Sequence, residues 1–146
     1  THITLWSILG SPLLIGCDMA ELDDFTLNLL CNSEVIDVNQ DELGWQASRI
    51  YGDDSYATYL KPLADGTVAV AMFNLSSEPK KIGFIPRSLG VIGSQVIRDL
   101  WRQKDICTCG YHERWETEVA PHGCVFVKLT PVQKNFVPEG FDKNIK

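Results

Sequence analysis

The chain has 146 residues, of which 45% are hydrophobic and 22% are charged, and this balance is typical of a folded domain. The formal net charge of -6 and the isoelectric point near 4.9 argue against nucleic acid or an anionic membrane as a partner, because phosphate groups are bound by basic surfaces. No apolar stretch approaches the roughly 20 residues that a membrane-spanning helix needs.

Residues 1–15 have the pattern of a helix followed by a strand. The segment 1–10 is amphipathic and is expected to end as a helix at Gly10 and Pro12, since proline has no backbone donor. The run Leu13–Ile15 is apolar without interruption, which is the pattern of a strand buried on both faces of a parallel sheet.

A second helix is expected at about residues 23–32. Either Asp23 or Asp24 can cap its start, because a side-chain oxygen at that position accepts amide hydrogens of the first turn. The pair Asn32-Ser33 is a weak point at which the helix can break. The order of strand, turn and helix is that of a terminal βα unit.

From residue 47 the hydrophobic period changes from helical to alternating, which marks a second domain at 47–131. Its strongest hairpin signal is Ala64-Asp65-Gly66, because an Asp-Gly pair supplies the positive φ angles of tight turns. The strand expected at 67–75 is apolar on both faces and should lie centrally between two layers. The other strands are expected at 57–63, 80–85, 95–100, 117–119 and 124–129. Such short strands, separated by Gly and Pro, indicate an antiparallel β-sandwich.

The last segment, residues 132–146, is polar, contains Pro138 and Gly140 and has no periodicity. We expect it to be a tail or a linker. The predicted fold class is therefore α/β plus all-β, with an α/β unit at 1–46, the sandwich at 47–131 and the tail.

Several sequence blocks follow one another in a fixed order: Leu5-Trp6, the run Ser-Pro-Leu-Leu-Ile-Gly-Cys-Asp at 11–18, the run Glu-Val-Ile-Asp-Val-Asn-Gln-Asp-Glu-Leu-Gly at 34–44, Arg-Asp-Leu-Trp at 98–101 and Ala-Pro-His-Gly at 120–123. In this order the blocks resemble the C-terminal portion of the α-galactosidases, or melibiases, of glycoside hydrolase family 27 (GH27). The resemblance implies that residues 1–46 are the last helix, strand and helix of a (β/α)8 barrel. It also implies that the sandwich is the accessory domain. A complete barrel needs about 250 residues, so we expect the chain to be the end of a longer enzyme.

The resemblance also implies a function for the parent enzyme, which would hydrolyse terminal α-galactosides with retention of configuration. Related enzymes on this fold accept N-acetylgalactosamine or arabinopyranose. The partner of this chain would be the remainder of the barrel, the galactoside would bind through the parent, and no cofactor is implied. The compartment would be secreted, periplasmic or lysosomal.

No residue of this chain is assigned a catalytic role, because the two catalytic aspartates of the resembled enzymes lie on earlier barrel strands. Retention requires two carboxyl groups about 5 Å apart. The adjacent pairs Asp23-Asp24 and Asp53-Asp54 do not suit this geometry, since neighbouring side chains diverge on a helix and point to opposite faces of a strand. The isolated chain is therefore expected to be inactive.

Cys17 and Asp18 are the candidate substrate-binding residues. Active sites of such barrels form at the C-terminal ends of the strands, where the residues after 13–15 would emerge. The alternative is that Asp18 caps the next turn. Cys17 departs from the family pattern, which usually has a small or amide residue at this place.

Cys107, Cys109, His112, His122 and Cys124 supply soft ligands, but their spacing argues against zinc. Structural zinc sites present ligand pairs separated by two to four residues, whereas Cys107 and Cys109 are separated by one. No metal site is predicted.

The alternative function is a non-catalytic carbohydrate-binding or interaction β-sandwich module, in which aromatic side chains stack on sugar rings. The aromatic candidates are Trp45, Trp101, Trp115, Tyr51, Tyr56 and Tyr59. For Trp101, the resemblance favours packing in the core or at the seam with the barrel over sugar binding.

Overall fold

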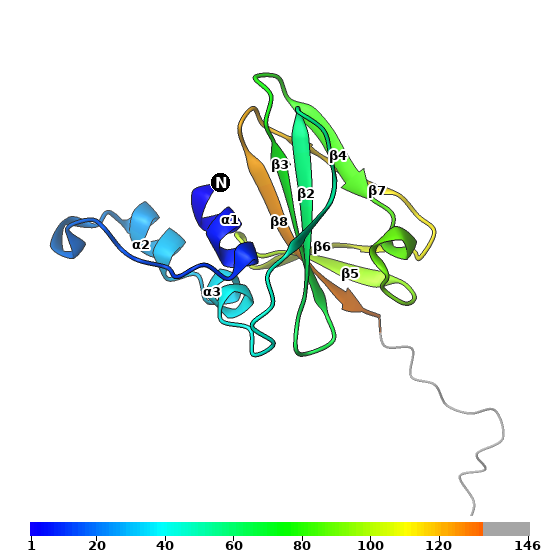
Figure 1. The fold of residues 1–146 in the computed structure, drawn as a ribbon, viewed down its shortest axis with the longest axis horizontal. Coiled ribbons are helices and arrows are strands. Elements are labelled where there is room, and N and C mark those ends of the chain that lie inside the picture. Colours follow the sequence, from blue (N-terminus) through cyan, green and yellow to red (C-terminus); the bar gives the residue numbers. More distant parts are fainter. Residues whose placement is uncertain (133–146) are drawn as a thin grey trace, which may run out of the picture.

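The structure is a computed structural model that describes residues 1–132 (Figure 1). The N-terminal part contains α1 (His2–Leu9), the 3-10 helix η1 (Met19–Glu21), α2 (Asp24–Leu30) and α3 (Ser33–Asn39). The strands that follow are β1 (Ser48–Gly52), β2 (Tyr56–Pro62), β3 (Val68–Asn74), β4 (Lys80–Phe84), β5 (Gln95–Asp99), β6 (Lys104–Cys109), β7 (Trp115–Val119) and β8 (Cys124–Pro131), with the 3-10 helix η2 (Pro86–Leu89) before β5. The tail expected at 132–146 lies outside the described residues, except for Val132.

The strands form two antiparallel sheets. The larger sheet has six strands in the order β1-β2-β3-β8-β5-β6, and the smaller one pairs β4 with β7. The two sheets enclose one apolar core, while α1 and α3 cover the opposite face of the larger sheet (Figure 1). The predicted antiparallel β-sandwich is therefore confirmed. None of the helices within residues 1–132 has the length and apolar character that crossing a membrane would require.

Strand β3 lies at the centre of the molecule, and all seven of its residues are buried. Val70 and Met72 belong to the core between the sheets, where Phe84 of β4 also lies. Ala71, on the opposite face of β3, belongs to the second core beneath the helices. Fully burying a large apolar side chain stabilises a fold by about 1.5–3 kcal/mol. The prediction of a strand with two buried faces is confirmed.

The hairpin between β2 and β3 forms at the predicted turn. Gly66 has φ 80°, and its amide donates to the carbonyl of Leu63. Asp65 fixes the turn by accepting hydrogen bonds from the amide of Thr67 (2.9 Å) and from Lys128 Nζ (2.7 Å). Burial alone would raise the pKa of Asp65, but the hydrogen bonds from Lys128 and Thr67 outweigh it, so the pKa lies below its ordinary value.

The helices end near the predicted positions. Helix α1 stops at Gly10, whose left-handed φ of 65° favours glycine. Asp23 caps α2 by accepting a hydrogen bond from the amide of Thr26 at 2.7 Å, and hydrogen bonding with Thr26 lowers the pKa of Asp23. The helix expected at about 23–32 breaks at the predicted weak point, because Asn32 instead caps α3.

Residues 13–15 form no strand in this structure, contrary to the pattern of their sequence. Leu14 is 80% exposed and Ile15 is 49% exposed. The physical reason is that a strand of a parallel sheet needs hydrogen-bonded neighbours, and none of the described strands pairs with this segment.

Candidate functional site

The candidate site is the seam between the N-terminal helices and the larger sheet, together with the loop that leads from α1 to α2. Ile8 of α1 and Val35 and Val38 of α3 are at most 2% exposed. They share a core with Ala71 and Phe126 of the sheet. This apolar contact holds α1 and α3 in place, whereas α2 and the loop before it project away from the sandwich (Figure 1).

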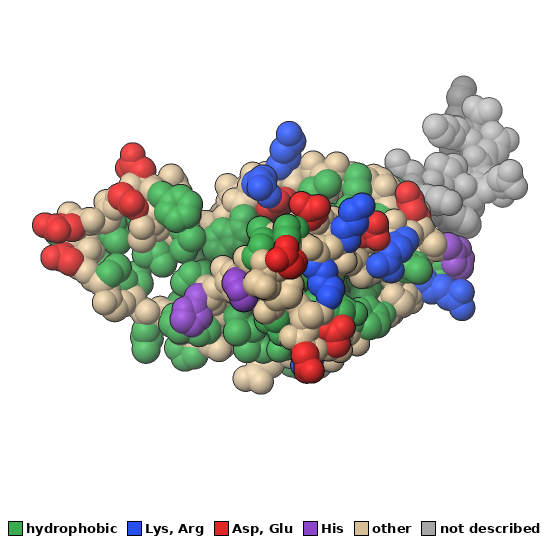
Figure 2. Space-filling model, turned by 90° about the horizontal axis from the view of Figure 1, so that it is seen from above, with side chains coloured by type: hydrophobic (Ala, Val, Ile, Leu, Met, Phe, Trp, Pro, Cys, Tyr) green, Lys and Arg blue, Asp and Glu red, His purple; other side chains and the backbone are tan. Residues whose placement is uncertain are grey.

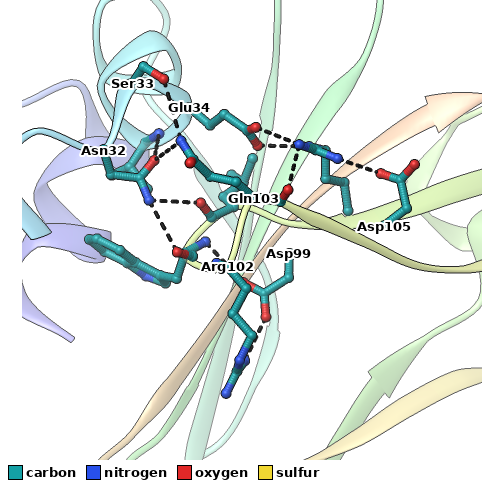
Figure 3. Close-up of polar contacts among 11 residues, drawn as sticks. Asn32, Ser33, Glu34, Asp99, Arg102, Gln103 and Asp105 are labelled. Carbon is teal, nitrogen blue, oxygen red and sulfur yellow. Dashed lines mark hydrogen bonds and ion pairs between the residues drawn. The ribbon is translucent and has the colours of Figure 1, made fainter. Parts of the chain in front are cut away.

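A set of polar contacts, which we call the α3 clamp, joins the start of α3 to the turn after β5 (Figure 3). Asn32 Nδ2 donates to the carbonyl oxygens of Leu100 (3.0 Å) and Trp101 (3.3 Å), while its Oδ1 accepts the amide of Val35 at 3.2 Å. Gln103 Nε2 lies 3.4 Å from Asn32 Oδ1. A single buried amide therefore caps a helix and anchors a loop of the sandwich.

Arg98 and Glu34 form the ionic part of the α3 clamp. Arg98 Nε lies 2.9 Å from Glu34 Oε2, and Nη2 lies 2.7 Å from Oε1, a bidentate arrangement. Asp105 accepts from Nη1 at 2.9 Å. The hydrogen bonds with Glu34 and then Asp105 raise the pKa of Arg98 above its ordinary value. Both partners lie in sequence blocks that carry the resemblance, but no local pattern joins residues 64 positions apart.

Trp101 lies at the seam, as the packing interpretation predicts. Its indole Nε1 donates to Thr4 Oγ1 of α1 at 2.9 Å. Thr4 is fully buried and lies 3.2 Å from the sulfur of Cys124, so the contact continues into β8. Trp101 is thus occupied by packing against α1.

Cys17 and Asp18, the predicted substrate-binding residues, lie on the projecting loop and are exposed. Asp18 caps η1 by accepting the amide of Ala20 at 2.9 Å, as the alternative interpretation expects. Neither Cys17 nor Asp18 lines any of three surface pockets within residues 1–132. Their contact with a substrate stays a prediction.

The cysteines are all free thiols, and those of the Cys-x-Cys pair lie on β6, which the sequence pattern did not predict as a strand. Burial, followed by the charge of Glu113, raises the pKa of Cys107 and Cys109. Within residues 1–132, no three Cys, His, Asp or Glu side chains are grouped closely enough to hold a metal ion.

An apolar hollow of about 260 Å³ opens between α1, the loop after it, and the helices α2 and α3. Its lining consists of Ile3, Trp6, Leu13, Leu14, Ile15, Leu29, Leu30, Val35, Ile36 and Gln40. Figure 2 shows hydrophobic side chains on both sides of the gap between the projecting part and the body of the molecule. Beyond the hollow, Met19 (67%) and Phe25 (74%) are also largely exposed. Contiguous apolar surface that is open to solvent is a candidate contact site.

Comparison with known proteins identifies the sandwich. Residues 53–129 match the family model of the alpha galactosidase C-terminal beta sandwich domain. The chain belongs to this family. The resemblance to GH27 melibiases is thereby confirmed.

Similar proteins extend the match to the N-terminal helices. An alpha-galactosidase of Oryza sativa is 36% identical over 133 residues, covering 90% of this chain and 31% of that protein. The structure of alpha-galactosidase I from Mortierella vinacea superposes with a TM-score of 0.81 at 28% identity, over 89% of this chain and 34% of that one. The structure of a GH27 β-L-arabinopyranosidase from Geobacillus stearothermophilus superposes with a TM-score of 0.82 at 32% identity, over 90% of this chain and 29% of that one. The chain thus spans about a third of the length of the relatives that it matches.

Proposed function

We propose that this chain completes the (β/α)8 barrel of a retaining α-galactosidase. In this proposal α1, residues 13–15 and the pair α2 and α3 supply the last helix, strand and helix of the barrel. The observation that carries it is the apolar hollow at Leu13–Ile15, because leaving such surface in water costs about 25 cal/mol per Å². The greater length of the relatives supports the proposal, since it provides chain that would cover this surface.

The sandwich has a structural role in this function. Through the α3 clamp and the core under α1 and α3 it holds the last elements of the barrel, so that residues 13–15 begin from a fixed position. An interface between two domains of one chain tolerates relative motion unless it is extensive. A bidentate ion pair and a buried amide add specific geometry to the apolar contact.

The reacting carboxylates belong to the part of the barrel that precedes these residues. Hydrolysis with retention needs a nucleophile and an acid/base about 5 Å apart, and we assign neither role within this chain. Terminal α-galactosides are the proposed substrates because the similar proteins include alpha-galactosidases. Asp18 and Cys17 would lie at the rim of the sugar pocket, where residues after the last strand emerge.

The test is a chimera in which this chain replaces the matched C-terminal segment of the Oryza sativa alpha-galactosidase. We expect the chimera to release p-nitrophenol from p-nitrophenyl α-galactoside, while this chain alone releases none above a buffer blank. The matched control is the chimera carrying Leu14→Asp and Ile15→Asp, which should lose activity because charge in a barrel strand disrupts its packing. A folded but inactive chimera, or hydrolysis by the isolated chain, would contradict the proposal.

The non-catalytic sugar-binding module predicts a different result. Trp45 (56% exposed) and Phe25 (74% exposed) are the most exposed Trp and Phe rings of residues 1–132, whereas Tyr51, Tyr56, Tyr59 and Trp115 are half-buried. Saturable binding of galactose by the isolated chain, lost in Trp45→Ala, would favour the module. Absence of binding together with an active chimera would favour the enzyme.

A further inference from the structure

Lys61 is a charged side chain with no exposed surface, and neither the α3 clamp nor the apolar seam explains why a charge is buried there. It lies on β2, paired with Ala69 of β3, on the face of the sheet that the helices cover. The small side chain of Ala69 leaves room for the lysine to extend toward the helices. Burying a charge is costly unless it is paired, so a specific reason for this residue is required.

The ammonium group of Lys61 lies where two helices end. Its Nζ donates to the carbonyl oxygen of Val38, in the last turn of α3, at 2.5 Å. It also lies beside Gly10, the C-cap of α1, where an added Cβ would be 3.8 Å from Nζ and 4.0 Å from the carbonyl oxygen of Asn39. The carbonyl groups at a helix C-terminus carry partial negative charge, which attracts a cation.

The environment of Lys61 does not suit a residue that mainly stabilises the fold. Within residues 1–132, no carboxylate forms an ion pair with it. Burial lowers the pKa of Lys61, and the charge of Asp41 only partly opposes this. Replacing a buried charge with an apolar side chain of similar volume is often neutral or stabilising, whereas the charge can specify one arrangement.

We propose that Lys61 is a positioning residue that fixes the C-terminal ends of α1 and α3 relative to each other and to the sandwich. Asn39 completes the arrangement, because its Nδ2 donates to the carbonyl oxygens of Trp6 (3.3 Å) and Ser11 (2.8 Å). The segment 11–15 begins at this junction. Lys61 therefore sets where the last barrel strand starts, a role that rests on the proposed function above.

The test compares Lys61→Met, which keeps the length of the side chain but removes its donor, with the unchanged chain by hydrogen exchange. The reporter amides are those of Gly10, Ser11 and Gln40, which close the helix ends. We expect their exchange to become about tenfold faster, while the amides of β3 and β8 keep their protection and the unfolding midpoint in urea stays near that of the unchanged chain. Lys61→Arg, which retains a charged donor, should restore most of the lost protection.

The control is Lys81→Met, at an exposed lysine of β4, which should leave all these amides unchanged. Unchanged protection of the helix ends in Lys61→Met would overturn the proposal. An equal loss of amide protection in β3 and β8 would also overturn the proposal, since Lys61 would then act as an ordinary core residue. If Lys61→Met does not fold, Lys61→Gln is measured with the same two readouts. Because the assay uses this chain alone, its outcome is independent of whether the chimera is active.

Discussion

The sandwich and the N-terminal part of this chain place similar apolar sequences in opposite environments. All seven residues of β3 are buried, because the strand is paired on both sides and covered on both faces. In the N-terminal part, Leu14 (80%) and Phe25 (74%) are largely exposed. An apolar run therefore indicates burial, whereas the neighbours that bury it can belong to another part of a protein.

The largest difference between the two regions should be seen with phenylalanine. Phe126 is 1% exposed in the core beneath the helices, so Phe126→Ala should lower the free energy of unfolding by about 3–5 kcal/mol. Phe25→Ala, at an exposed position, should change it by less than about 0.5 kcal/mol. Urea unfolding followed by tryptophan fluorescence measures both. Equal effects would mean that α2 packs more closely in solution than the structure describes.

Asn32 tests how the two regions are joined. Asn32→Ala removes both a helix cap and a donor to Leu100 and Trp101, and should cost about 1–3 kcal/mol. Asn32→Asp keeps the acceptor that caps α3 but sets a carboxylate oxygen against the carbonyl oxygens of Leu100 and Trp101, so it should cost at least as much as Asn32→Ala. The measurement is again urea unfolding of each variant. Unchanged stability of Asn32→Ala would show that the Asn32 hydrogen bonds of the α3 clamp contribute nothing to the free energy of unfolding.

Asp65 gives a smaller effect that depends on pH. Its pKa is lowered in the folded state, so as the pH falls the unfolded state binds more protons than the folded state does. The stability that Asp65 contributes is therefore present above about pH 4, and it is lost as the pH falls through the lower pKa of the folded state. The side chains of Asp65 and Lys128 are partly exposed, which limits the effect to below about 1 kcal/mol. Asp65→Asn should flatten the stability curve in this acidic range, measured by urea unfolding at a series of pH values. Asp54→Asn, at an exposed aspartate, is the control, and an identical change in both variants would exclude the Asp65 hydrogen bonds as the cause.

The smallest change in stability is expected from the combined variant Leu14→Ser and Ile15→Ser. Both side chains are exposed, so the free energy of unfolding should change by less than about 0.5 kcal/mol. Binding of an apolar fluorescent dye should nevertheless decrease, because the hollow loses part of its apolar lining. A large loss of stability would mean that these residues are covered within the chain, and would remove the main argument for an absent barrel.

Local signals in the sequence predicted much of the sandwich. The Asp-Gly pair at 65–66 placed the hairpin, and the uninterrupted apolar run of β3 placed the central strand. Strand β6 was missed because five of its six residues are exposed, so its sequence has no alternating pattern. Its existence depends on pairing with β5 at the edge of the sheet, for example through Val96 and Thr108.

Features with a local physical cause, such as the end of α1 at Gly10 and the break between α2 and α3 at Asn32, follow from the amino-acid sequence alone. The pairing of Arg98 with Glu34, the burial of Lys61 between two helix ends and the exposure of Leu14 and Ile15 could be seen only in the folded chain. The physical reason is separation along the chain. Caps and tight turns act over a few residues, whereas these features depend on how distant segments pack together.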